Sequence, residues 1–344
     1  MRSFILACCL SLCAAGAVLA QQPAPSTPLP DFKPPQMPIV PPWDAFVFTE
    51  PVKGSDIPVD ITLLETVDGL YMPIGLRHPA GKGPFPIVMF FSGNGGSGVR
   101  AVREYVNNQA AYTMERYLKA GYAVGYLNYR AESWFEYTRV KPLTVSHHQA
   151  NQLLNRPALE YNDLMTIVQY VKTLPYVDPN RVGLCGNSHG GGMILKAGAE
   201  GMQVAAAISS EPDTSEFLQI DEKGFAGDEN QLPTMASVAP FLKNKDLAME
   251  RIKRINFPVL FVLRTHDSLE GLFETAFTWM KEAGKNVESV KYDHPVHGFI
   301  IRVPRDEKGN AKPDDIQVKI IQQSIDFFNK NMPAGGAASK GTLQ

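Results

Sequence analysis

The feature that most constrains the fold is a serine with glycines on both sides, placed between a strand pattern and a helix pattern. Residues 182–185 form a short apolar run, residues 186–190 read G-N-S-H-G, and a helical pattern starts near Gly191. A sharp strand-to-helix turn leaves little room for side chains, and the glycines two positions before and after the serine satisfy that restriction. The sequence therefore predicts that Ser188 projects from the end of a strand at the N-terminus of a helix.

Strand and helix patterns alternate along most of the chain, which predicts an α/β fold with a mostly parallel central sheet and helices on both faces. Two early strand patterns, 59–65 and 71–77, are joined at Asp68-Gly69 and predict an antiparallel N-terminal hairpin. Further strand patterns cover 86–91, 123–128, 182–185, 204–209, 259–263 and 289–292. Helical patterns cover 102–119, 158–173, a segment from 191, 272–283 and 316–331.

The two ends of the chain differ in composition from the middle. Residues 1–20 have a basic start, an apolar run and a small-residue end at Ala20, which predicts a cleaved signal peptide. Residues 21–42 contain nine prolines and predict an extended linker. Residues 43–332 then form one catalytic domain, and 333–344, rich in Gly, Ala and Ser, form a disordered tail.

The N-terminal segment predicts export, either to the periplasm or out of the cell. Two alternatives remain for residues 1–20. An uncleaved membrane anchor needs about 18–20 apolar residues, which this run barely reaches, and a lipoprotein needs a cysteine at the cleavage site, where none stands. After cleavage we expect no membrane span.

Charge bears on the expected binding partners, and cysteine content bears on disulfide bonds. The formal net charge is −2 without a basic stripe, so nucleic acid is not an expected partner. Three of the four cysteines lie within residues 1–20, which leaves Cys185 alone in the mature chain and excludes an intramolecular disulfide there. No motif specifies the oligomeric state.

A serine hydroxyl is a weak nucleophile near neutral pH and needs a histidine base oriented by an acid. Asp267 follows the apolar strand pattern 257–263, at the end where open α/β sheets place functional groups. His297 lies in the loop after the last strand pattern. The order Ser188, Asp267, His297 is that of a nucleophile-elbow hydrolase.

Each partner of Ser188 has an alternative. Glu211 and Asp213 follow the preceding strand pattern and are possible acids, in which case Asp267 is only a helix N-cap. His294 lies three residues before His297 and is an alternative base. Gly298 favours His297, because it gives the loop freedom to bring that ring over the serine.

Acyl transfer also needs donors for the oxyanion. The backbone N–H of His189, directly after Ser188, is one candidate. The second is the backbone N–H of Asn94, in the glycine-rich residues 92–96 after the strand pattern 86–91. The spacing of a phosphate-binding P-loop is absent from this stretch.

Residues 177–183, V-D-P-N-R-V-G, lead into the serine motif, and together with Asp267 and the H-G-F of 297–299 this pattern resembles the dienelactone hydrolase and prolyl oligopeptidase branch of the α/β hydrolases. The resemblance covers about residues 55–331. It implies the α/β-hydrolase fold, a serine triad, and ester or amide hydrolysis with no metal and no organic cofactor.

The chain departs from both groups. Peptidases of this branch carry a large N-terminal propeller, whereas this chain has a short proline-rich stretch before the domain. They often have a tyrosine in the oxyanion loop, and this chain has Phe91 in that region. Dienelactone hydrolases proper use a cysteine nucleophile. We therefore expect an exported serine esterase; an exported peptidase or amidase, and a non-catalytic binding protein on the same fold, are the alternatives.

Two long segments, 132–157 and 212–256, are longer than usual connections and form a lid or wall the substrate pocket. Their aromatic residues either line the pocket or pack inside the lid. They are Trp134, Phe135, Tyr137, Phe217 and Phe241.

Overall fold

A computed structural model describes residues 46–66, 71–91, 93, 98–127, 157–220 and 232–333. All of them belong to one compact unit, Pro42–Gln344. The predicted signal peptide, linker and most of the tail lie outside the described residues, as do Asn94, Trp134, Phe135 and Tyr137. The predicted domain boundaries therefore stay predictions.

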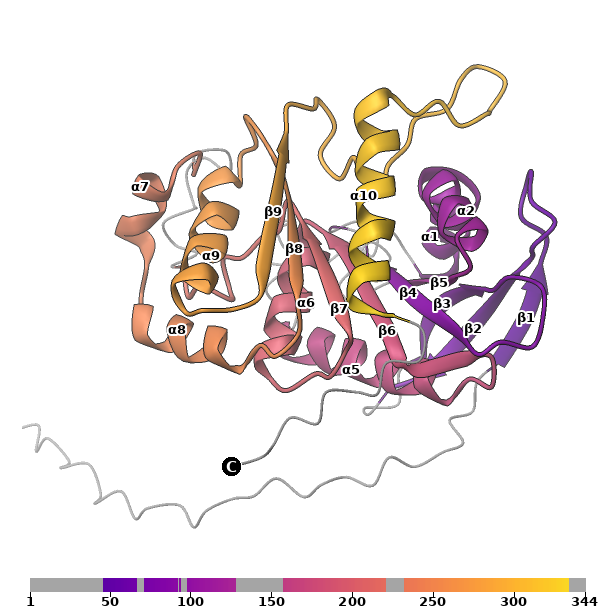
Figure 1. Cartoon of the computed structure of the whole chain (residues 1–344), viewed down its shortest axis with the longest axis horizontal. Helices are drawn as coiled ribbons and strands as arrows, with labels where there is room; N and C mark the ends of the chain where they lie inside the picture. Colours follow the sequence, from indigo (N-terminus) through magenta and orange to yellow (C-terminus); the bar gives the residue numbers. More distant parts are fainter. Residues whose placement is uncertain are drawn as a thin grey trace, which may run out of the picture. The chain divides into compact units, whose positions relative to one another are not determined.

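The centre of the structure is a nine-stranded sheet with the order β1-β2-β3-β5-β4-β6-β7-β8-β9 (Figure 1). Strands β1, β2, β3 and β5 pair antiparallel, and every pair from β5 to β9 is parallel. The predicted fold class and the antiparallel hairpin are confirmed. The strands are β1 Phe46–Glu50, β2 Val59–Glu65, β3 Tyr71–Arg77, β4 Phe85–Phe91, β5 Ala123–Leu127, β6 Val177–Asn187, β7 Ala206–Ser210, β8 Val259–Arg264 and β9 Val287–Tyr292.

Helices cover both faces of the sheet (Figure 1). One face carries α1 Gly98–Glu104, the π-helix η1 Tyr105–Gln109, α2 Ala111–Lys119 and α10 Asp315–Asn331. The other carries α5 Pro157–Thr173, α6 His189–Ala199, α8 Lys245–Arg254 and α9 Glu270–Glu282, with the short helices α7 Met235–Val238 and η4 Ala239–Phe241 before α8.

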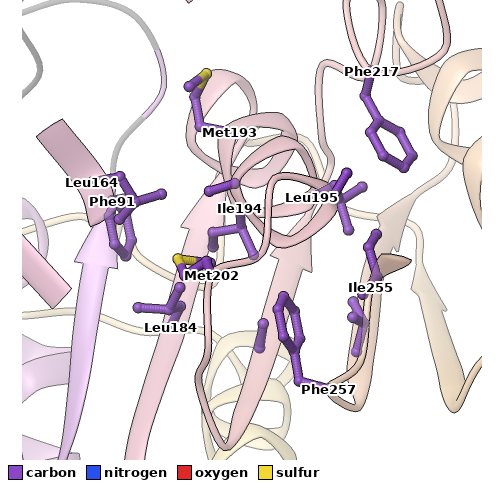
Figure 2. Packing of buried hydrophobic residues seen from close by; sticks show 14 of the residues in the cluster. Phe91, Leu164, Leu184, Met193, Ile194, Leu195, Met202, Phe217, Ile255 and Phe257 are labelled. Atoms are coloured by element: carbon purple, nitrogen blue, oxygen red, sulfur yellow. The ribbon is translucent and has the colours of Figure 1, made fainter. Parts of the chain in front are cut away.

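The strands alternate between two hydrophobic cores, one on each side of the sheet. In β4, Ile87 and Met89 belong to the core under α5, α6, α8 and α9, whereas Val88 and Phe90 belong to the core under α2 and α10. Figure 2 shows part of the first core, where Leu184 of β6 lies near Ile194 of α6. Each fully buried side chain of this size contributes roughly 1.5–3 kcal/mol, so the α6 side is held rigidly against the sheet.

The sequence predicts one helix over 102–119, but the structure has three segments there. The N–H of Ala110 bonds to the carbonyl of Tyr105 at 2.8 Å, a five-residue step that belongs to a π-helix. The Tyr105 ring stacks on Tyr126 of β5 with centroids 4.4 Å apart. Among the described helices, none is long and apolar enough to span a bilayer.

Candidate active site

Ser188 forms the turn between β6 and α6, as the sequence predicts. Its backbone has φ 54° and ψ −124°, a conformation that costs a non-glycine residue about 1–3 kcal/mol. The turn is tight: a Cβ on Gly186 would lie 2.6 Å from the carbonyl group of Gly190. The N–H of Ser188 bonds to the carbonyl of Ser210 at 2.9 Å, which fixes the turn to the end of β7.

Three neighbouring strands end next to a strained residue. Ser188 follows β6, Glu211 with φ 42° follows β7, and His266 with φ 58° lies two residues after β8. Only one other non-glycine residue in the described part of the chain has a positive φ, Gln219. Backbone strain concentrates at functional sites, so this edge of the sheet is the candidate site.

His297 and Asp267 meet at this edge. Nδ1 of the His297 ring lies 2.8 Å from Oδ2 of Asp267, whose side chain is fully buried, whereas 30% of the His297 side chain is exposed. The N–H of Leu269 and Nε of Arg264 also donate to the Asp267 carboxylate, at 2.8 Å and 3.0 Å. Burial alone would raise the pKa of Asp267, but the bonds from His297 and Leu269 and the charge of Arg264 hold it below its usual value.

Glu211 is a second buried carboxylate beside the same ring. Its Oε2 accepts the N–H of Gly298 at 2.7 Å, and its Oε1 accepts Nε of Arg264 at 3.1 Å and lies 3.9 Å from Nδ1 of His297. Burial raises the pKa of Glu211 to about 7, although His297, the Gly298 N–H and Arg264 act against that rise.

Glycines bring the serine turn and the histidine loop together. Gly298 has φ 80°, and a Cβ there would lie 2.6 Å from Nδ2 of Asn187, the residue before Ser188. A Cβ on Gly93, after β4, would lie 3.3 Å from Oγ of Ser188. The backbones of Gly93 and Gly298 thus pack against the serine turn, and Gly298 directly follows His297.

The sequence model of the prolyl oligopeptidase family matches residues 110–332, more than half of the chain. The chain belongs to the prolyl oligopeptidase family. A stretch of 103 residues is 33% identical to the quorum-quenching protein AidA of Acinetobacter baumannii, and it spans only 30% of this chain and 30% of AidA.

Solved structures support the same α/β-hydrolase fold. An acetyl xylan esterase from a Paenibacillus species has a TM-score of 0.54 at 15% identity, with 83% of this chain and 89% of that one covered. A protein from Klebsiella pneumoniae assigned as a dienelactone hydrolase scores 0.52 at 18%, covering 80% and 100%. Acylaminoacyl peptidase from Pyrococcus horikoshii has a TM-score of 0.53 at 18% identity. The match covers 87% of this chain but only 43% of the peptidase. The predicted resemblance to this branch is confirmed.

The side chains of the alternative base His294 and the alternative acid Asp213 make contacts with residues other than Ser188 and His297. Nε2 of His294 lies 2.7 Å from Oδ2 of Asp314, and its ring stacks on Phe299. Oδ1 of Asp213 accepts the N–H and the hydroxyl of Ser215. Of the predicted alternatives, only Glu211 lies next to His297.

Of the two predicted oxyanion donors, the structure describes His189 but not Asn94. His189 begins α6, and its ring lies 2.6 Å from the buried carboxylate of Glu160 in α5. This contact turns the ring toward α5 and agrees with a role for the backbone N–H instead. Asn94 lies outside the described residues.

Two of the five predicted aromatic pocket residues, Phe217 and Phe241, lie in the described part of the chain, and they differ in burial. Phe217 is 1% exposed and belongs to the hydrophobic core that includes Leu195 (Figure 2), which is the second of the two alternatives, packing inside the segment. The segment after β7 folds back over α6 and buries its phenylalanine. Phe241 is half-buried at the end of η4 and packs against the same core.

Glu211, Asp267 and His297 offer ligand atoms within 4.8 Å of one another, the spacing of a metal site. However, Arg264 donates to both carboxylates, and a divalent cation between them would face the guanidinium charge. The donor set fits an ion-paired carboxylate group better than a metal centre.

Arg264 is a site residue that the sequence analysis missed. It is the last residue of β8, directly after the apolar run 259–263, and its side chain is largely buried. A charged residue at the carboxyl end of a buried strand is the signal that would have identified it.

Proposed function

We propose that this protein is an exported serine hydrolase that cleaves carboxylic esters, with Ser188 as nucleophile, His297 as general base and Asp267 as the acid that orients the base. The observation that carries the proposal is the combination of a strained Ser188 on the β6–α6 turn with the 2.8 Å contact between His297 and Asp267 at the same sheet edge. Membership in a serine hydrolase family supports it.

In the proposed reaction, Oγ of Ser188 attacks the ester carbonyl while His297 takes the hydroxyl proton, and Asp267 stabilises the resulting imidazolium. Backbone N–H groups of His189 and Asn94 bind the oxyanion. Collapse of the tetrahedral intermediate breaks the ester C–O bond, and His297 gives its proton to the leaving alkoxide. Water, activated by His297, then releases the acid and restores Ser188.

Fluorophosphonate labelling tests the nucleophile. We expect one adduct on Ser188, located by peptide mapping, and a loss of p-nitrophenyl ester hydrolysis by about 10³-fold or more in Ser188→Ala. His297→Gln should lose a similar factor. His294→Gln is the comparison variant, because it makes the same change three residues away, and it should lose far less activity than His297→Gln. Ester turnover without an adduct on Ser188 would contradict the proposal.

Family membership supports a second candidate, an exported peptidase or amidase. Esters of graded acyl length and peptide p-nitroanilides, assayed on the same preparation, separate the two. Anilide hydrolysis at rates rivalling ester hydrolysis favours the peptidase. A non-catalytic binding protein on this fold would turn over neither substrate and would take up no fluorophosphonate.

The second part of the proposal is export, which rests on residues 1–20. N-terminal sequencing of protein from the cell envelope and the medium should show a chain that starts at Gln21. A chain that retains Met1 and fractionates with membranes would instead indicate an N-terminal anchor.

A further inference from the structure

The proposed triad needs one carboxylate, yet two lie buried beside His297. The side chains of Glu211 and Asp267 are both fully buried. Burial of an unneeded carboxylate is costly, so a second one at the same ring calls for a reason. Glu211 also adopts φ 42°, a conformation disfavoured for a residue with a side chain.

The contacts of Glu211 fix the loop that carries the base. Its Oε2 accepts the Gly298 N–H at 2.7 Å, directly after His297, and the hydroxyl of Ser210 at 3.2 Å. Its own N–H bonds to the Val262 carbonyl in β8 at 2.8 Å. The position of the His297 backbone is therefore coupled to the ends of β7 and β8 through this one residue, by its side chain and by its backbone N–H.

Charge gives the second half of the argument. Arg264 donates to Oδ2 of Asp267 at 3.0 Å and so offsets the negative charge that Asp267 would present to a protonated His297. The carboxylate of Glu211 lies 3.9 Å from Nδ1 of His297 and adds a second negative charge beside Arg264, Asp267 and His297. Two carboxylates, one guanidinium and one imidazolium sum to zero, whereas the group without Glu211 carries a positive charge when His297 is protonated.

We propose that Glu211 is a positioning residue for His297: its carboxylate holds the histidine loop through Gly298 and supplies the charge that balances Arg264 when the imidazolium forms. This inference rests on the proposed function, because it assigns His297 the role of base. The charged groups that face Glu211 are His297 from the loop after β9, and Arg264 and Asp267 from the end of β8.

The test replaces Glu211 with Gln, which keeps the size and one acceptor and removes the charge. Without that charge the imidazolium is less stable, so the acidic limb of the kcat/KM profile should move to lower pH by roughly 0.5–1 unit. At the plateau, kcat should fall about 10-fold while KM changes little, because the imidazolium develops only in the transition state. A merely structural role would leave the acidic limb in place.

Asp213→Asn is the matched control, because it removes a carboxylate two residues away that contacts Ser215 instead of His297. It should leave the acidic limb where it is. NMR titration of the His297 ring in Ser188→Ala protein, assigned with a His297→Gln spectrum, reads the same effect without turnover. A midpoint lowered by Glu211→Gln supports the inference even in a protein without esterase activity, and an unchanged midpoint overturns it even if ester hydrolysis is established.

Discussion

His294 and Asp314 are joined by a 2.7 Å contact between Nε2 of the ring and Oδ2 of the carboxylate. His294 lies three residues before His297, and Asp314 is the N-cap of α10. Because α10 packs against the sheet through its buried face, this contact connects the loop of the proposed base to a rigid element. The histidine that the sequence offered as an alternative base thus contributes to the placement of His297.

Asp314→Ala should therefore affect both stability and activity. It removes the helix cap, in which Oδ1 accepts the Gln317 N–H at 2.8 Å, and the contact with His294. We expect the free energy of unfolding to fall by about 1–2 kcal/mol, measured by urea denaturation, and kcat to fall severalfold. Asp314→Asn keeps a cap acceptor and should lose less stability. If both variants were destabilised equally, the contact with His294 rather than the cap would carry the stability.

Glu211→Gln should change the pH dependence of stability as well as of catalysis. Burial raises the pKa of Glu211 from 4.5 to about 7 in the folded protein, so the folded state resists ionisation. Ionising the buried Glu211 lowers the free energy of unfolding of the parent protein. This loss of stability is absent below about pH 4.5, grows as pH rises to 7, and is constant above that, with an upper bound of ~3 kcal/mol. The melting temperature of the variant relative to the parent should accordingly rise between about pH 5 and pH 8. A difference that does not change with pH would argue that Glu211 is ionised in the folded protein at both ends of this range.

Much of the fold was predictable because apolar runs and glycine turns report directly on local geometry. The predicted strand at 71–77 has the bounds of β3, and the predicted turn at Ser188 is present. β1 was missed, because Phe46–Glu50 is a short edge strand next to the proline-rich residues. The break in the 102–119 helix was missed as well, since a π-helix depends on the packing of Tyr105 and not on periodicity.

The candidate site was predictable to the extent that it follows chain order. Order and strand ends were enough to favour Asp267 and His297, which the structure brings into contact. Order does not reveal that Glu211 and Arg264 join the same group, because that depends on the adjacency of β7 and β8 and on side-chain direction. For the same reason the sequence left open whether Phe217 lines a pocket or packs inside its segment: burial in the core is a property of the folded segment, not of the residue type.

Gly93→Ala should impair catalysis with little effect on folding. A Cβ at this position would lie 3.0 Å from Cβ and 3.3 Å from Oγ of Ser188, closer than side-chain carbons normally approach, so the serine must shift. We expect kcat/KM for p-nitrophenyl esters to fall about 10-fold or more, since small displacements of reacting groups are costly.

Gly121→Ala is the control for Gly93→Ala. Gly121 has φ 88° and open space around it, in the turn between α2 and β5. This substitution should lower the free energy of unfolding by about 1 kcal/mol through backbone strain and leave kcat/KM unchanged. If the two variants lost activity in proportion to stability, the close approach of Gly93 to Ser188 would not be functional.

Cys185 should be unreactive in the folded protein although it lies only three residues from Ser188. Its side chain is fully buried next to Phe90 in β4, and burial raises the pKa of the thiol well above its usual range. The thiolate is the reactive form, so Ellman's reagent should detect no thiol at about pH 8 until a denaturant is added. The number of thiols then detected also tests signal cleavage, because the chain has four cysteines and three lie within residues 1–20. One thiol per denatured chain is expected for the exported protein, and four would show that the N-terminal segment is retained.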